Sequence, residues 1–367
     1  MAIQVWEYLT ELETEREDIS NAIQQVLWSG RLILGESVTR FEAEFAEYCG
    51  VGYGVGVDNG TNAISLGLRA IGIKQGDEVI TVANTAVPTV SAIDAVGATA
   101  RFVDIESRTY LMDVTQVESV VNSKTTCILP VHLYGQCVNM DAVRAVAARH
   151  GLAILEDCAQ CHGAKTHGRR AGAMSDAAAF SFYPTKVLGG YGDGGMVLSD
   201  SEATASRVRS LRSYGMKDAY YSLEQGFNCR LDELHAEILR RKLKRLDQYI
   251  ERRRQLARRY DQLLADTPLV LPCERPDNVH VYYLYVVRHA RRDEIMAKLK
   301  EREIHVNVSY RWPVHTMSGF DKLGYRKGDL PETEAAADEI FSLPMYPSLT
   351  DDEQTTVCDV LHEMVRD

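Results

Sequence analysis

This chain of 367 residues has few cysteines. It shows no long apolar run and no leader-like pattern. Eight scattered cysteines exclude a disulfide-stabilised scaffold, which is typically short and cysteine-dense. No run approaches the ~18 apolar residues that a membrane span needs. The first 14 residues are polar and acidic, without the basic-then-apolar order of a secretory leader. We therefore expect a soluble, cytoplasmic protein with no membrane partner.

Positive charge is also in short supply. Lysine and arginine number 41 against 52 aspartates and glutamates, for a formal net charge of −11. This balance argues against nucleic acid as a partner. The 45% hydrophobic and 25% charged content is that of an ordinary globular chain. The length allows about two domains at ~150 residues each, and we expect an enzyme.

Short apolar runs alternate with helical stretches between residues 50 and 200. This alternation predicts an α/β domain with a mostly parallel seven-stranded sheet covered by helices on both faces. Two helices, the second over residues 38–49, are predicted before it. The predicted strands are 53–57, 78–81, 100–103, 126–131, 153–155, 177–182 and 196–198, and the helices between them are 62–70, 89–96, 114–121 and 140–150.

The pattern changes after residue 200, which predicts a smaller C-terminal α+β domain. We place the domains at 1–240 and 241–367. The predicted elements of this part are a long helical pattern over 231–264, strands at 279–287 and 305–309, and helices at 293–302 and 350–365.

Two motifs in the large domain resemble functional sites but lack the context these require. Cys158-Ala159-Gln160-Cys161-His162 matches both a haem-attachment pattern and a redox C-x-x-C, yet no export leader precedes it and no regular helix follows. Gly190–Gly195 satisfies G-x-G-x-x-G, but an apolar strand follows where a dinucleotide site needs a helix. A nicotinamide-dependent oxidoreductase is therefore a weak alternative, and no metal site is expected.

The residues that carry chemistry follow two predicted strands. Strand 153–155 runs into Glu156 and Asp157, and strand 177–182 runs into a loop with Lys186, followed by glycines. Strand ends of a parallel sheet meet where such folds bind ligands. A lysine and an acid placed in this way suit pyridoxal phosphate, which needs a Schiff-base lysine and an acidic partner for its ring nitrogen.

The phosphate of such a cofactor needs hydrogen-bond donors. Residues 59–62 follow strand 53–57 and open a helix, and a helix N-terminus favours phosphate. The hydroxyl of Ser181, five positions before Lys186, is a further candidate donor.

Ordered motifs cover nearly the whole chain. They are Ser29-Gly30, Leu34-Gly35, Phe41-Glu42, Gly60-Thr61, Gly76–Ile80, Phe102–Asp104, Val131–Gln136, Glu156–Gln160, Phe180–Lys186, Gly226–Arg230 and Ser342–Pro347. With these motifs the chain resembles the DegT/DnrJ/EryC1/StrS family, nucleotide-sugar aminotransferases of the pyridoxal phosphate fold type I, which is aspartate aminotransferase-like. The resemblance implies Lys186 as the Schiff-base lysine, Asp157 as the pyridinium partner and Gln160 as the contact to the ring hydroxyl.

The resemblance implies further contacts and an assembly. Gly60, Thr61 and Ser181 would hold the phosphate, joined by Asn228 from a neighbouring subunit. That last role implies a homodimer with shared active sites.

The segment 83–89 departs from the usual family pattern, because it has no aromatic residue to stack on the cofactor ring. The role then passes to Ala86 or Val87. This variant resembles the branch that aminates the 3-keto position. We expect transfer of an amino group from glutamate, through pyridoxamine phosphate, to a dTDP-3-keto-6-deoxyhexose. The alternatives are a 4-keto-sugar or keto-inositol aminotransferase and a non-catalytic pyridoxal phosphate-binding protein.

Contacts to the acceptor substrate are the least constrained expectation. Its diphosphate needs cations, for which Arg31 and Lys217 are candidates, and Tyr183 and His315 are candidates for the sugar.

Overall fold

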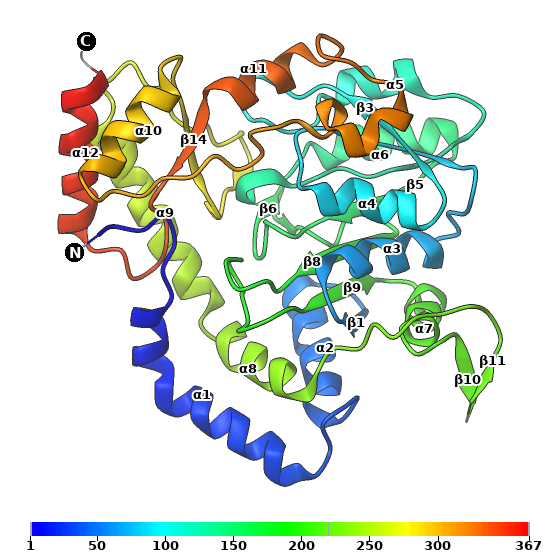
Figure 1. The fold of residues 1–367 in the computed structure, drawn as a ribbon. Coiled ribbons are helices and arrows are strands. Elements are labelled where there is room, and N and C mark those ends of the chain that lie inside the picture. The colour runs from blue at the N-terminus through cyan, green and yellow to red at the C-terminus, as the bar shows by residue number, and fades with distance from the viewer. Residues whose placement is uncertain (1, 219, 366–367) are drawn as a thin grey trace.

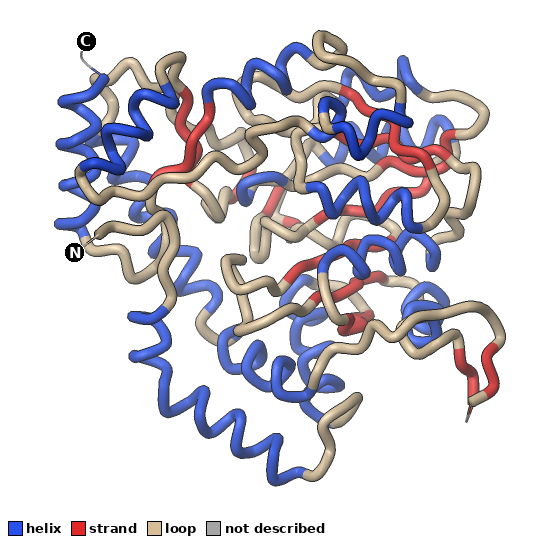
Figure 2. Tube along the Cα trace, in the orientation of Figure 1, coloured by secondary structure: helices blue, strands red, loops and turns tan. Residues whose placement is uncertain are grey.

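A seven-stranded sheet lies at the centre of the N-terminal part of the chain, up to residue 211 (Figures 1 and 2). The structure is a computed structural model that describes residues 2–218 and 220–365. The sheet order is β1-β9-β8-β5-β4-β2-β3. The strands are β1 (Tyr53–Val57), β2 (Glu78–Val82), β3 (Thr99–Val103), β4 (Thr125–Ile128), β5 (Ala153–Asp157), β8 (Ala177–Ser181) and β9 (Gly195–Ser199).

The sheet is parallel except at one side. Strands β3, β2, β4, β5 and β8 pair in parallel, whereas β9 is antiparallel to both β8 and β1. Because helices cover both faces, strands such as β8 are buried along their whole length, which explains their near-continuous apolar sequences. The predicted α/β fold and all seven predicted strands are confirmed.

Helices connect the strands and pack on the sheet. The predicted helix 140–150 is confirmed to the residue, whereas 114–121 is a 3-10 turn followed by a short helix. The elements are α1 (Leu9–Ser29), α2 (Glu36–Cys49), α3 (Gly60–Ala70), α4 (Val87–Ala95), η1 (Val114–Gln116), α5 (Val117–Val120), η2 (Leu133–Gly135), α6 (Met140–His150) and α7 (Glu202–Leu211).

The C-terminal part has its own apolar core. It packs Tyr260, Tyr285, Phe341 and Leu361 together, and Ile3 from the N-terminal segment joins them. Figure 1 accordingly shows the N- and C-terminal ends on the same side. The elements are α8 (Glu233–Leu243), α9 (Leu246–Leu263), β13 (Tyr285–Arg288), α10 (Arg292–Glu301), η3 (Val314–Thr316), η4 (Ser318–Leu323), α11 (Pro331–Glu339), β14 (Ile340–Leu343) and α12 (Asp351–Val365).

Small two- and three-stranded sheets lie outside the central sheet. One hairpin extends away from the body near α7 (Figure 1). These pieces are β6 (Lys165–Thr166), β7 (Arg169–Arg170), β10 (Met216–Asp218), β11 (Tyr221–Ser222) and β12 (Asn278–Val279). Among the described residues, none of the helices has the length and apolar character needed to cross a membrane.

Three expectations for the C-terminal part were wrong. The helical pattern 231–264 is two helices, because a tight turn at Arg245 separates α8 from α9. The segment 279–287 is strand only at its two ends, since Tyr282 between them has a positive φ of 47°. The segment 305–309 makes a single bridge, Asn307 to Ser342, before Tyr310 turns the chain with φ 70°. The predicted domain boundary falls within α8 and stays a prediction.

Candidate active site

Asp157 is the last residue of β5 and lies at the carboxyl end of the parallel sheet. One carboxylate oxygen accepts a hydrogen bond of 2.9 Å from the hydroxyl of Thr89, and the other accepts one of 3.1 Å from the Ala159 amide. The side chain is buried, and burial raises its pKa despite these two donors. The site therefore holds a carboxylate that two neutral donors fix in place and whose charge a cationic partner would stabilise.

Glu156, the preceding residue, points to the opposite face of the strand, as strand geometry requires. It accepts hydrogen bonds from His132 Nε2 at 2.8 Å and from the amides and hydroxyl of the turn 172–175. The other ring nitrogen of His132 accepts the Val138 amide at 3.1 Å. Both ring nitrogens are thus engaged. Although His132, Glu156 and Cys158 have metal-ligand spacing, the geometry is that of an internal hydrogen-bond network.

Lys186 lies in the loop that follows β8, and its ammonium lies 4.6 Å from the ring centroid of Tyr283. The Tyr283 hydroxyl is 3.0 Å from that of Thr185. This places Tyr283, from the segment before β13, against the lysine. The aromatic ring fixes the amine by a cation–π contact without neutralising it.

The N-terminus of α3 lies directly beside the end of β8. Asn59 caps α3 by accepting the Asn62 amide at 2.8 Å, and the first two helical amides, Gly60 and Thr61, have no intrahelical acceptor. A Cβ at Gly60 would lie only 2.6 Å from Cβ of Ser181. The close approach brings two helix-terminal N–H groups and one hydroxyl to one point, a geometry suited to phosphate.

Gln160 is held by two tyrosines that lie far apart in the sequence. Its Oε1 accepts the Tyr134 amide at 2.8 Å, and its Nε2 donates to the hydroxyl of Tyr310. Tyr134 and Tyr310 both have positive φ values, 58° and 70°. A positive φ at a non-glycine residue is a strained backbone conformation. Such strain persists only where surrounding contacts hold the residue in place, and it clusters at functional sites.

These residues fit pyridoxal phosphate. Asp157 offers a buried carboxylate for the ring nitrogen, and Lys186, whose ammonium lies against the Tyr283 ring, forms no ion pair within 4 Å among the described residues. The cradle formed by α3 and Ser181 offers phosphate donors, and Gly60 leaves it no space for a side chain.

The other predicted site residues occupy different environments. Tyr183 is 52% exposed beside the lysine loop, and Arg31, Lys217 and Asn228 are exposed. His315 is buried, and its Nε2 lies 2.9 Å from Glu334. Contact of His315 with a sugar would require this pair to open.

The two motifs discounted from the sequence have structural explanations. Cys158 and Cys161 are fully buried, and burial raises the pKa of both thiols, so they are poor nucleophiles. Gly190 and Gly192 pack against the ring of His235, where a Cβ would lie within 2.8 Å of it. The glycine run allows this close approach, and β9 follows it directly.

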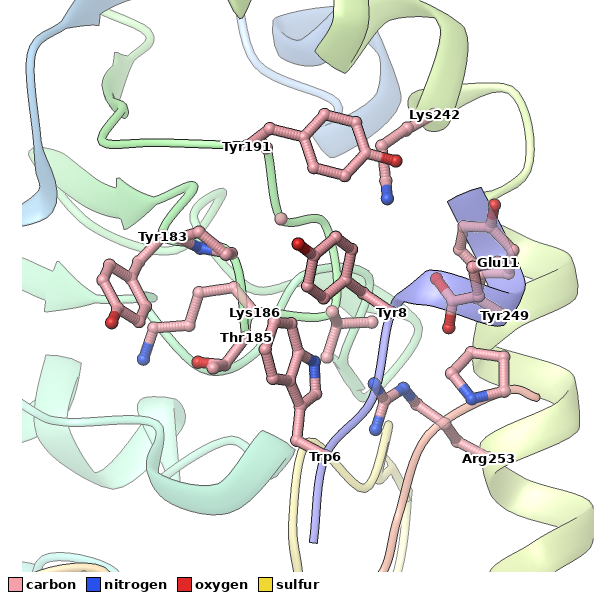
Figure 3. Close-up of a pocket in the computed structure, with 15 residues that line it drawn as sticks. Trp6, Tyr8, Glu11, Tyr183, Thr185, Lys186, Tyr191, Lys242, Tyr249 and Arg253 are labelled. Carbon is pink, nitrogen blue, oxygen red and sulfur yellow. The ribbon is translucent and has the colours of Figure 1, made fainter. Parts of the chain in front are cut away.

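A cavity of about 290 Å³ opens beside the loop that carries Lys186 (Figure 3). It is lined by backbone and side-chain atoms of this loop and by residues of the N-terminal segment, α8 and α9. The ammonium end of Lys186 points toward Tyr183, away from Lys242 and Arg253.

Sequence reasoning missed four residues of the site. Thr89, Tyr134, Tyr283 and Tyr310 contact Asp157, Gln160 or Lys186. Thr89 lies in the segment already noted for lacking an aromatic residue, and its position one turn after Thr85, to which it bonds at 2.8 Å, was an available signal. Tyr134 lies in the Val131–Gln136 motif, which marked the segment but not this contact, whereas the contacts of Tyr283 and Tyr310 depend on tertiary structure.

Comparison with known proteins agrees with this geometry. The model of the DegT/DnrJ/EryC1/StrS aminotransferase family matches residues 13–362. The chain is 56% identical to the dTDP-3-amino-3,4,6-trideoxy-alpha-D-glucose transaminase of Micromonospora megalomicea subsp. nigra, over 100% of this chain and 99% of that protein.

Two solved structures share the fold. DesV of S. venezuelae, in complex with a ketimine intermediate, superposes with a TM-score of 0.98 at 41% identity and covers 100% of this chain and 99% of its own. NtdA of Bacillus subtilis, with bound cofactor PMP, has a TM-score of 0.90 at 31% identity and covers 96% of this chain and 82% of its own. The similarity to DesV covers the whole chain and therefore includes both the sheet and the C-terminal part.

Proposed function

The chain belongs to the DegT/DnrJ/EryC1/StrS aminotransferase family, and on this basis we propose that it makes a nucleotide-linked 3-amino sugar. The amino group comes from glutamate. The acceptor is a dTDP-linked 3-keto-6-deoxyhexose, and the cofactor is pyridoxal phosphate, carried as pyridoxamine phosphate between the two halves of the reaction. Full-length similarity to a 3-amino-sugar transaminase supports the choice of acceptor.

One observation carries the proposal: the convergence of Asp157, Lys186 and the α3 cradle at the strand ends. Each feature alone is common, but together they offer an acid, an amine and a phosphate site to one planar ligand. Pyridoxal phosphate, when bound, supplies an electron sink that stabilises negative charge on the carbon bearing the amino group.

Side chains of this protein hold the cofactor in place and transfer the protons. Asp157 keeps a proton on the ring nitrogen by electrostatic attraction, and Thr89 and the Ala159 amide hold its carboxylate in place. Lys186 Nζ accepts the proton lost from the donor carbon and delivers one in the acceptor half. Gln160, fixed by Tyr134 and Tyr310, orients the ring through its hydroxyl.

We propose that the site is completed by a second copy of this chain. Asn228 is exposed and is available to reach the phosphate in a partner's site. Arg31 and Lys217, also exposed, are the proposed cations for the acceptor diphosphate, and Tyr183 is the proposed contact to the sugar.

The test follows the visible absorbance of the purified protein before and after excess glutamate. We expect a yellow band that bleaches, and a Lys186→Ala variant that stays folded but shows no bleaching. A panel of 3-keto and 4-keto nucleotide sugars then restores the band only with the true acceptor. A protein that stays colourless with added pyridoxal phosphate contradicts the proposal.

A further inference from the structure

Two buried threonine hydroxyls lie in series behind the carboxylate of Asp157. Thr89, in the first turn of α4, donates its hydroxyl hydrogen to one carboxylate oxygen at 2.9 Å. The hydroxyl oxygen of Thr85, which lies just before α4, is 2.8 Å from that of Thr89. Both threonines are buried. The three side chains therefore form one chain of hydrogen bonds that ends at the acid.

The charge of Asp157 fixes the direction of this chain. An ionised carboxylate can only accept hydrogen bonds, so Thr89 must give its single hydroxyl hydrogen to the acid. At its other contact Thr89 can then only accept, which makes Thr85 the donor of the threonine pair. Among the described residues, the Thr85 hydroxyl has no other hydrogen-bond partner. Its hydrogen is thus available for Thr89 alone.

Backbone contacts on both sides hold Thr85 in place. Ala83, two residues earlier, accepts the Val314 amide at 3.1 Å. Ala86, the next residue, precedes the first residue of α4 and accepts the Thr89 amide at 3.1 Å. This turn brings the two hydroxyls together. A donor that is fixed before a ligand arrives costs no reorganisation when the ligand binds.

The chain favours the charged form of Asp157. Burial raises the pKa of this carboxyl group, which therefore tends to hold a proton, and a neutral carboxyl pairs poorly with a protonated ring nitrogen. A hydrogen bond to an ionised acceptor is roughly twice as strong as one between neutral groups. Hydrogen bonds in series also strengthen one another. Thr85 thus adds to the stabilisation that Thr89 gives the carboxylate.

Other titratable side chains also face Asp157, and they come from separate segments of the chain. They are His132, Cys161, Lys186 and Tyr310. Among the described residues, none of them forms a hydrogen bond with Thr85. A variant that lacks only the Thr85 hydroxyl keeps all four, so their effects cancel when it is compared with the wild type.

We propose that Thr85 is a positioning residue of the active site, which acts through Thr89 to keep Asp157 charged and directed at the cofactor ring nitrogen. The inference rests on the proposed function, in which pyridoxal phosphate binds at Asp157. Thr85 itself bonds only to Thr89 among the described residues. Its effect on the acid must therefore disappear when the Thr89 hydroxyl is removed.

The test titrates pyridoxal phosphate into the apoprotein by fluorescence, from about pH 5 to about pH 9. In Thr85→Val the dissociation constant should rise roughly two- to fivefold at acidic pH, the loss expected when a charge-assisted hydrogen bond weakens by about 30%. At alkaline pH Asp157 is charged in both proteins, so the two constants should converge. Thr85→Ser keeps the hydroxyl and should bind as wild type does. Thr85→Ala removes the same hydroxyl with a smaller side chain and should repeat the pH-dependent loss.

Thr81→Val is the matched control. Thr81 lies in β2 and is fully buried, but its hydroxyl has no hydrogen-bond partner among the described residues. Its removal should leave the cofactor affinity unchanged at every pH. A double variant supplies the second check, because Thr85→Val should add nothing to the loss that Thr89→Val causes alone.

Wild-type affinity in Thr85→Val and Thr85→Ala at every pH overturns the inference. A loss of affinity that does not change with pH also overturns it, because it would indicate a displaced loop rather than a less ionised acid. Additive losses in the double variant do the same. A wild-type protein that forms no yellow band with pyridoxal phosphate contradicts the proposed function and this inference together, whereas a yellow wild type with unaltered Thr85 variants contradicts this inference alone.

Discussion

Gly60→Ala tests the cradle formed by the start of α3 and the end of β8. The new methyl carbon would lie 2.6 Å from Cβ, 3.1 Å from Oγ and 3.3 Å from Cα of Ser181. These atoms belong to a buried strand end and cannot rotate away. The helix and the strand must therefore separate by about 0.8 Å, the shortfall from an ordinary contact of 3.4 Å.

The separation has different consequences for the fold and for the cofactor. Overpacking costs about 1–3 kcal/mol, and the better helix propensity of alanine returns up to ~1 kcal/mol, so the apoprotein should lose about 3 kcal/mol or less. A phosphate cannot keep full contact with both α3 and Ser181 after the shift. Losing one hydrogen bond to a charged group costs about 1.5–3 kcal/mol, so pyridoxal phosphate should bind roughly tenfold to 150-fold more weakly.

The assay combines urea denaturation of the apoprotein with fluorescence titration of pyridoxal phosphate. Gly67→Ala is the control, because it lies in the same helix and the single close contact of its Cβ would be 2.7 Å to Cδ1 of Leu155, the movable end of a side chain, with Val197 Cγ1 and Leu155 Cγ at ordinary distances of 3.8 and 3.9 Å. We expect it to bind cofactor as wild type does. A Gly60→Ala variant with wild-type cofactor affinity would refute the cradle as the phosphate site.

Three further predictions concern single side chains. Thr89→Val removes one of the two donors to Asp157, so cofactor affinity measured by titration should fall about tenfold or more, whereas Thr89→Ser should restore it; an unchanged affinity in Thr89→Val would argue against this hydrogen bond. Lys186→Ala should abolish turnover and leave the urea midpoint close to wild type, because the side chain is half-buried and makes no ion pair among the described residues; residual full activity would contradict its role. Burial lowers the pKa of His162 from 6.5 to about 3. The contribution of its neutral ring to the free energy of unfolding is therefore complete above the pKa of the unfolded state and is lost as the pH falls toward 3. His162→Leu should reduce the pH dependence of unfolding free energy by about 1.4 kcal/mol per unit between about pH 6 and pH 4, and an unchanged slope would show that other groups dominate.

The central sheet and its helices could be predicted from the sequence because the patterns that indicate them are local. Buried parallel strands are short apolar runs, and the helices between them begin and end at capping residues, as α6 does at Asn139 and Gly151. The C-terminal part was harder to predict, since its strands are four residues or fewer and Tyr282, with a positive φ, interrupts the chain between β12 and β13. Nothing in residues 305–309 distinguishes a strand from an extended segment that makes one bridge.

The site residues also fall into a group that local sequence patterns predict and a group that they do not. Asp157 and Lys186 follow strands directly, so the topology alone brings them together, and the sequence predicts their proximity. Tyr310 reaches Gln160 across 150 positions of the chain, and its contact depends on how the C-terminal part packs on the sheet. Local patterns carry no information of that kind, which is why the tyrosines around the site emerged only from the structure.

The two adjacent acids at the end of β5 show how the fold selects which of them can serve a ligand. Burial opposes the charge on Glu156, yet hydrogen bonds from His132, Ser175 and the Gly172 amide outweigh it and lower its pKa. Burial also opposes the charge on Asp157, and there it prevails and raises the pKa, because the donors are fewer and neutral. A carboxylate whose charge is already compensated gains little from a new cation, whereas one that is under-compensated gains much. Glu156 therefore serves the internal structure of the protein. Asp157 is the acid whose charge a protonated ring nitrogen would stabilise.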